Sequence, residues 1–393
     1  MNTLLFNFVT VEPIWNIDST QLIVKIAVIE KWYVWPIPLL EIADLNFNSW
    51  WKDKDFSRLN YGMFLRWDNF TGRKDMLKVL LRFGNEDKLG LYYELPSFNK
   101  KQNFGVDIGI SYAQKHEIAV ESIDNELIYF RDDDVYVKES FSSFIRLTYR
   151  PKIHHKQHIT IEYQDISIVD TLIPLYPSLT LNNLSKLKFL SLSYKYIVDY
   201  RDFILYPLSG YYFDIELTKM GLGMVQENGT DFLFIKSKFN YYWKLKDHWF
   251  YGAGLLTKFS NAKYQPYVLQ RGLGYFNDFV RGYELYIMDG QHYGLFRSNL
   301  KYELLPKRIH NFKFIKNEKF SKVYYAIYLN LFFDLGYVKD RYNAILNPLV
   351  NEFQYGYGIG LDYVTYYDMI FRIEYSINRQ NEKFLFFHVK APF

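Results

Sequence analysis

Apolar and polar residues alternate with a period of two along most of this chain. Residues 322–336 show the pattern most clearly, because every odd position from Val323 to Leu335 is apolar, whereas Asn330 and Asp334 are among the even positions. Successive side chains of a strand point to opposite faces, so such a segment predicts a strand with one apolar and one more polar face. Sixteen segments are predicted as strands in this way, near residues 58–69, 73–84, 87–97, 103–115, 117–131, 138–150, 156–168, 187–199, 210–220, 231–245, 247–260, 292–305, 322–336, 353–363, 368–378 and 383–393.

A soluble β-sandwich also alternates, so the number, length and aromatic content of the strands decide between the two folds. An even number of antiparallel strands is typical of single-chain bacterial outer-membrane barrels. Several segments are longer than the usual sandwich strand, and many Tyr and Phe lie near strand ends, where their rings would meet the two membrane interfaces. We therefore predict an all-β fold, a 16-stranded antiparallel transmembrane β-barrel formed by residues 51–393.

Composition narrows the class of protein further. Aromatic residues make up 20% of the 393 residues, and the longest run without an acidic or basic side chain, 171–185, contains two prolines. That run is shorter than the roughly 20 apolar residues of a spanning helix. A net charge of +4 is too small to indicate a nucleic-acid partner, and the absence of Cys excludes a disulfide scaffold.

The last predicted strand has a regular apolar face that ends on the last residue. Leu385, Phe387, Val389 and Phe393 share this face, and His388 lies on the opposite one. Such an alternating strand with a terminal Phe resembles the carboxy-terminal signal of bacterial outer-membrane proteins, which their assembly machinery recognises as an unpaired strand.

The amino end has a different pattern. Segments 4–11 and 21–30 alternate around a polar turn and predict a β-hairpin, and a proline-bearing stretch, 32–40, follows it. Residues 1–50 are thus interpreted as a hairpin and a linker outside the barrel. The chain does not start with the basic segment and long apolar run of a signal peptide. Since an outer-membrane protein must cross the inner membrane, we expect the natural precursor to extend upstream of Met1.

One connection is much longer than the others. About 30 residues separate the strands that end near Ser260 and start near His292, and loops of this length are usually functional or disordered. The loop contains the string Val280, Arg281, Gly282 and Tyr283. Two strands later, Phe332, Asp334 and Gly336 share the polar face. A loop folded into the lumen would let Arg281 pair bidentately with Asp334, and Gly336 would leave room for the loop backbone.

These two motifs, with sixteen strands and Phe393, resemble the Omp85 superfamily, the bacterial surface antigen family that includes the outer-membrane barrel insertase and its translocation relatives. In that family the loop lies inside the barrel and its arginine contacts the acidic strand motif, which implies these roles for Arg281 and Asp334. The hairpin is similar to the last two strands of a POTRA repeat, the periplasmic module of the family. The first strand and the helices of that repeat are missing, so residues 1–50 are interpreted as a partial POTRA.

A second glycine pattern has two interpretations. Gly356, Gly358 and Gly360 superficially suggest a nucleotide-binding loop, but they alternate with Tyr355, Tyr357 and Ile359 on a predicted strand that no helix follows. A glycine stripe on the lumenal face, which admits the long loop, is the preferred interpretation.

Other candidate sites are weaker. His154, His155 and His158 lie at a predicted turn with no Cys or carboxylate beside them, and 132–134 is an acidic turn for which weak Ca²⁺ binding is the alternative. No motif of a hydrolase or metalloprotease is present. We therefore expect no catalysis, no cofactor and no metal.

The resemblance implies a protein of the bacterial outer membrane, with its amino terminus in the periplasm, that assists insertion or translocation of other proteins. Its expected gate is the seam between the first strand, 59–69, and the last, 383–393, where a client strand would pair. Expected partners are outer-membrane lipid, client β-barrel or secreted proteins, and accessory lipoproteins or complex subunits. A passive or substrate-specific pore and a structural subunit of a larger complex are the alternatives.

Overall fold

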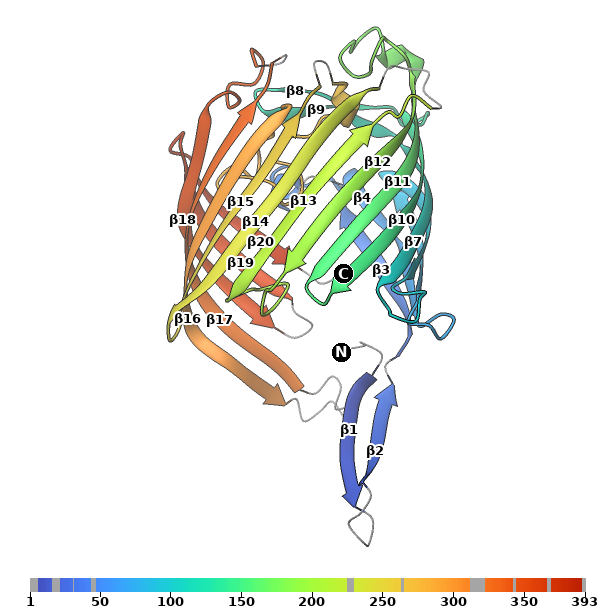
Figure 1. Cartoon of the computed structure of the whole chain (residues 1–393). Helices are drawn as coiled ribbons and strands as arrows, with labels where there is room; N and C mark the ends of the chain where they lie inside the picture. Colours follow the sequence, from blue (N-terminus) through green and yellow to red (C-terminus); the bar gives the residue numbers. More distant parts are fainter. Residues whose placement is uncertain are drawn as a thin grey trace.

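The computed structural model describes residues 6–15, 22–30, 32–43, 47–224, 230–262, 265–311, 322–341, 344–365 and 369–390. A single antiparallel sheet of sixteen strands curves into a barrel, as Figure 1 shows. Neighbours in the sheet are consecutive in the chain, except that β7 pairs with β10. The strands are β3 (Val34–Ile42), β4 (Leu59–Asp68), β5 (Met76–Gly84), β6 (Glu86–Leu95), β7 (Phe104–Lys115), β10 (Lys138–Lys152), β11 (His155–Ile168), β12 (Lys186–Asp199), β13 (Gly210–Met220), β14 (Phe232–Lys246), β15 (Trp249–Ser260), β16 (His292–Asn311), β17 (Lys322–Lys339), β18 (Phe353–Thr365), β19 (Ile370–Asn378) and β20 (Lys383–Lys390).

The remaining elements lie outside this sheet. A hairpin of β1 (Phe6–Trp15) and β2 (Leu22–Glu30) extends from one end of the barrel, and a second hairpin of β8 (Glu117–Ile123) and β9 (Glu126–Arg131) lies at the other end (Figure 1). A short helix, α1 (Phe47–Asp53), follows β3, and three 3₁₀ turns are η1 (Phe56–Arg58), η2 (Asp170–Leu172) and η3 (Tyr267–Leu269). No helix in the described ranges is both long and apolar enough to cross a membrane.

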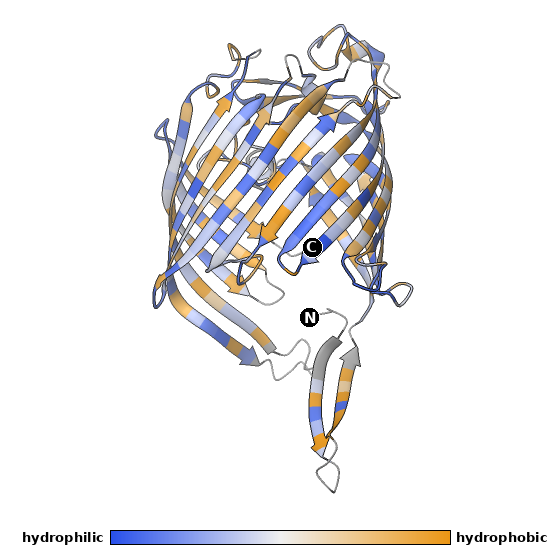
Figure 2. Ribbon diagram, in the orientation of Figure 1, coloured by the Kyte–Doolittle hydropathy of each residue, from blue (hydrophilic) through white to orange (hydrophobic). Residues whose placement is uncertain are grey.

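The barrel reverses the polarity of a soluble protein. On β17, Leu331 and Phe333 are exposed, whereas Asn330 and Asp334 are fully buried. The same alternation runs along β18, where Ile359 and Leu361 face outward and Asp362 is buried. Figure 2 shows apolar and polar residues following one another along the strands. Apolar side chains that face outward and polar ones that face the interior are the arrangement of a lipid-embedded barrel.

The predicted number of strands is confirmed, but two of the assignments are wrong. Residues 117–131 form the separate hairpin β8–β9 and not a barrel strand. Asp124 and Asn125 both have positive φ, which is the two-residue turn that reverses a hairpin, so the chain folds back in the middle of the alternating segment.

The first strand of the sheet is β3, in a stretch that was predicted to be part of the linker. Its prolines argued against a strand in the sequence, because a proline has no N–H to donate to a neighbouring strand. The backbone N–H of Asp68 donates to the carbonyl of Tyr33, so the backbone N–H and C=O groups of the odd residues of β3 point toward β4. The backbone groups of the even residues, including Pro36 and Pro38, point toward the outer edge of the sheet. Proline is tolerated at such an edge. The predicted first strand, 59–69, is therefore the second.

Three connections meet over the end of the barrel that carries β8–β9. Asn125, at the tip of this hairpin, is fully buried. Its backbone N–H donates to Asn347 Oδ1 (2.8 Å), its Nδ2 donates to the Ile287 carbonyl (2.8 Å), and its Oδ1 accepts from the Leu349 N–H (3.0 Å). The hairpin thereby joins the long loop 261–291 to the connection between β17 and β18.

We expect Asn125→Ala to lower the free energy of opening this junction by about 2–3 kcal/mol. The substitution removes the side-chain partner of the Ile287 carbonyl and of the Leu349 N–H. Amide hydrogen exchange in residues 285–290 should accelerate at least tenfold. Asn182→Ala is the matched control, because Asn182 also has positive φ but is exposed. Equal exchange in the two variants would contradict the role of the buried amide.

Candidate functional site

The long loop 261–291 enters the lumen and places an arginine against the barrel wall. Arg281 is 5% exposed, and its backbone N–H donates to Asp334 Oδ2 at 3.1 Å. Its guanidinium donates to the same carboxylate from Nε (2.9 Å, to Oδ2) and from Nη2 (2.5 Å, to Oδ1). This is the bidentate geometry that fixes both orientation and charge.

The three residues of the strand motif each contact the loop in a different way. Phe332 lies under the arginine, with Cζ of Arg281 4.1 Å from the centre of its ring, a cation–π contact. Asp334 supplies the carboxylate. At Gly336, an added Cβ would lie 2.4 Å from Cγ2 of Val280, so only glycine allows the loop this close. The spacing of two between these residues places all three on the lumenal face of β17.

The glycines of β18 divide into two groups. A Cβ at Gly356 would lie 1.8 Å from the carbonyl oxygen of Arg281, so this glycine directly admits the loop. The hypothetical Cβ of Gly358 would meet the Tyr375 carbonyl oxygen (2.1 Å) and the Phe332 ring, and that of Gly360 would meet the Glu374 side chain. These two glycines make room for the barrel wall itself.

The other residues of the loop string fix its backbone. Val280 and Tyr283 are fully buried, and Gly282 has φ +93°, a conformation that favours glycine. The Tyr283 hydroxyl donates to Gln354 Oε1 at 2.8 Å. A tyrosine hydroxyl is protonated at neutral pH, and burial raises the pKa of Tyr283 further, to about 12, so the group is a donor here.

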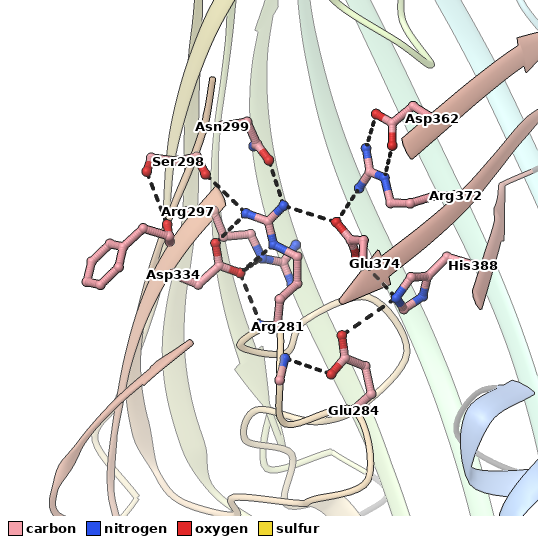
Figure 3. Close-up of polar contacts among 12 residues, drawn as sticks. Arg281, Glu284, Arg297, Ser298, Asn299, Asp334, Asp362, Arg372, Glu374 and His388 are labelled. Carbon is pink, nitrogen blue, oxygen red and sulfur yellow. Dashed lines mark hydrogen bonds and ion pairs between the residues drawn. The ribbon is translucent and has the colours of Figure 1, made fainter. Parts of the chain in front are cut away.

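A second layer of charged residues, not singled out from the sequence, surrounds the arginine. Nη1 of Arg281 donates to Asn299 Oδ1 (2.6 Å) and lies 3.4 Å from Glu374 Oε1. Figure 3 shows the arrangement, with Arg372 on the far side of Glu374. Arg372 forms a bidentate pair with Asp362, with distances of 2.6 and 2.8 Å. The alternation along each strand places these residues on the inward face. It does not indicate which residues of different strands come into contact.

Below the arginine, the loop reaches the last two strands through Glu284. Nε2 of His388, on β20, lies 3.6 Å from Glu284 Oε1 and 3.3 Å from Glu374 Oε2, on β19. Burial raises the pKa of the Glu284 carboxyl, and His388 beside it opposes this rise. The loop is therefore held at two places, at β17 by Arg281 and near β19–β20 by Glu284.

The outer edge of β20 is in contact with helix α1. Asn48 accepts the N–H of Phe387 at Oδ1 (3.0 Å), and its Nδ2 donates to the Phe387 carbonyl (3.3 Å). The two bonds match the pair that a neighbouring strand would make. No ladder joins β3 to β20 within the described residues. Leu385 and Val389 face outward like Phe387, whereas Phe393 lies outside the described residues.

The weaker candidate sites lie on other elements and form local contacts. His154 contacts the Asp199 carbonyl, His155 contacts the Tyr196 hydroxyl, and His158 contacts Thr148. His154 also stacks on the ring of Tyr200, and His155 Nε2 lies 3.3 Å from the Tyr200 hydroxyl. Within the described residues, the three histidines do not form a group with metal-ligand spacing. In the acidic turn, Asp132 Oδ1 accepts the backbone N–H groups of Asp134 and Val135, as in an ordinary turn.

Comparison with solved structures identifies other barrels of this architecture. BamA from Haemophilus ducreyi lacking POTRA domains 1–3 aligns with 99% of this chain and 76% of its own, at 13% identity and a TM-score of 0.63. CdiB from Escherichia coli aligns with 99% of this chain and 68% of its own, at 14% identity and a TM-score of 0.60. The fold is that of these barrels.

A third similar structure, CdiB from Acinetobacter baumannii, covers 98% of this chain and 65% of its own, at 11% identity and a TM-score of 0.56. The sequence matches no protein-family model and no curated protein. At identities this low, the structural likeness establishes a shared fold and nothing more. The function therefore has to be argued from the residues of this chain.

Proposed function

We infer that this protein is an Omp85-type protein of the bacterial outer membrane that assists the insertion, assembly or translocation of other proteins through a lateral seam. The outward apolar face supports a membrane location, and the likeness to BamA and CdiB supports the type of barrel. The observation that carries the proposal is the state of the two edge strands, β3 and β20.

Each edge strand has a feature that opposes closure of the seam. On β3, Pro36 and Pro38 remove two of the backbone donors that face outward. On β20, the side chain of Asn48 occupies the edge groups of Phe387. An unpaired edge is a template for another strand, and β-augmentation is how an extended client segment would use it.

In this proposal the contacts between loop 261–291 and the barrel wall have a structural role. Arg281 with Asp334 fixes loop 261–291 in the lumen, and Gly336 and Gly356 provide the space for it. The hairpin β1–β2 is the remnant of a POTRA repeat on the periplasmic side. Lipid would contact the outward apolar face, while accessory lipoproteins or complex subunits would bind outside the membrane.

Site-specific cross-linking tests the seam, because the chain has no Cys of its own. Leu385→Cys places a thiol at the outer edge of β20, and Ile373→Cys places one on β19, where Ile373 is also exposed and pairs with Phe387. With a reagent that joins a maleimide to a photoreactive benzophenone, which inserts into C–H bonds and needs no thiol on the client, we expect adducts with newly made outer-membrane proteins from position 385 and few from position 373. Asn48→Ala should raise the yield at position 385, because it uncovers the edge.

Adducts of equal yield from positions 385 and 373, or none from either, would contradict a client-binding seam. A large steady conductance, with no change in the levels of other barrel proteins on depletion, would favour the passive pore. Stoichiometric copurification with fixed partners, without client adducts, would favour the structural subunit.

A further inference from the structure

Three side chains of metal-binding type converge where the long loop meets the last two strands. Glu284 comes from loop 261–291, Glu374 from β19 and His388 from β20. One oxygen of each carboxylate and one ring nitrogen of His388 all lie within 4.8 Å of one another. Both glutamates are 1% exposed. Figure 3 shows the three groups pointing toward a common centre.

The outer oxygen of each carboxylate is already held. Oε2 of Glu284 accepts the Gly282 N–H at 2.8 Å. Oε1 of Glu374 lies 3.4 Å from Nη1 of Arg281 and 3.7 Å from Nη1 of Arg372. These contacts orient both carboxylates so that the other oxygen of each faces His388. This is how neighbouring groups orient the ligands of a metal.

The spacing of the inner atoms suits a shared ion better than direct hydrogen bonds. Nε2 of His388 is 3.3 Å from Glu374 Oε2 and 3.6 Å from Glu284 Oε1. Zn²⁺ binds its ligands at about 2.0–2.2 Å, so two ligands of a tetrahedral site lie about 3.3–3.6 Å apart. Within the described residues, Glu374 Oε2 and His388 Nε2 are buried and lie at ion-pair distance from each other, but neither makes a contact with hydrogen-bond geometry. A buried polar atom in this state indicates an ion or water that it would contact.

We propose that Glu284, Glu374 and His388 bind one divalent transition-metal ion of the Zn²⁺ type, with water as the fourth ligand. Two carboxylates and a neutral imidazole carry a charge of −2, which such an ion balances. The arginines nearest to Glu374 each have another carboxylate, Asp334 for Arg281 and Asp362 for Arg372. Imidazole with carboxylates favours Zn²⁺ over Ca²⁺ or Mg²⁺, which prefer oxygen ligands.

The ion would join the lumenal loop to both strands at the β20 end of the sheet. This inference goes beyond the proposed function and does not depend on it, since metal binding is measured on the purified protein. It also replaces the expectation, from the sequence, that the chain binds no metal. The sequence did not reveal the site because its ligands are distant in the chain, and only the register of β19 with β20 brings Glu374 and His388 together.

The test uses the purified full chain in detergent after treatment with a chelator. Titration calorimetry should show one equivalent of Zn²⁺ bound, and Co²⁺ should give the strong visible absorption of a tetrahedral site. His388→Ala should weaken Zn²⁺ binding at least 100-fold and abolish the tetrahedral Co²⁺ spectrum. His154→Ala is the matched control, because His154 lies at an exposed turn and its removal should leave both signals unchanged.

Glu284→Gln provides a second variant in case His388→Ala does not fold. The amide oxygen of this variant still accepts the Gly282 N–H, and folding is checked by heat-modifiable migration on gels. We expect its affinity for Zn²⁺ to fall at least tenfold. Absence of saturable binding in the natural protein would overturn the proposal and leave a protonated His388 between two carboxylates. Unchanged affinity in folded Glu284→Gln, or loss of binding in His154→Ala, would overturn it as well.

Discussion

Arg281→Ala should destabilise the barrel by about 3–5 kcal/mol, because it leaves Asp334 buried without its main counter-charge. Asp334 is fully buried and accepts three hydrogen bonds from Arg281. The variant keeps the backbone N–H but loses both guanidinium bonds. The other nearby cation, Arg297, is 3.6 Å away at Nε, and its guanidinium also contacts the carbonyl of Phe279. Urea unfolding of the protein in detergent, followed by Trp fluorescence, measures the change.

Two further variants separate the pair from the general charge of the lumen. Arg297→Ala removes a positive charge next to the same carboxylate, but its side chain is 32% exposed and does not form the bidentate pair, so we expect a smaller loss. The exchange Arg281→Asp with Asp334→Arg should recover part of the stability lost in either single variant. Full stability of Arg281→Ala would show that the pair does not hold the loop.

The strand motif was accessible from the sequence because it is local. Phe332, Asp334 and Gly336 follow one another at a spacing of two, so alternation alone places them on one face. Glu374 and His388 are equally well placed by alternation, but their contact with Glu284 depends on the depth to which the loop enters the lumen. Alternation indicates which face a residue occupies and carries no information on that depth.

The two wrong strand assignments have local causes that alternation does not detect. In 117–131 the second arm contains a continuous apolar run, 127–130, so hydrophobic periodicity does not indicate where the chain reverses. The reversal rests on the positive φ angles of Asp124 and Asn125. In β3 the prolines argue against a strand everywhere except at an edge. Whether a segment lies at an edge depends on the order of strands in the whole sheet. The position of Pro36 and Pro38 in an edge strand can therefore be recognised only from the complete fold.

Gly356→Ala should expel the loop from the lumen although it adds only one methyl group. The new Cβ would lie 1.8 Å from the carbonyl oxygen of Arg281 and 3.0 Å from its carbonyl carbon. Both are backbone atoms, so no side-chain rotation relieves the clash and the loop itself must withdraw. Overpacking of this kind costs about 1–3 kcal/mol, and the bonds of Arg281 to Asp334 are lost in addition.

The absence of Cys allows this displacement to be measured directly. Ile287 is 1% exposed in the loop, so Ile287→Cys should react slowly with a maleimide in the natural background and at least tenfold faster with Gly356→Ala. Gly294→Ala is the matched control, since a Cβ at Gly294 has no atom within 4 Å.

If the loop is held as one unit, Gly356→Ala and Arg281→Ala together should lower the free energy of unfolding by less than the sum of the two single effects. The reason is that either change alone already displaces the loop. Additive costs would mean that the glycine and the arginine act on different parts of the barrel.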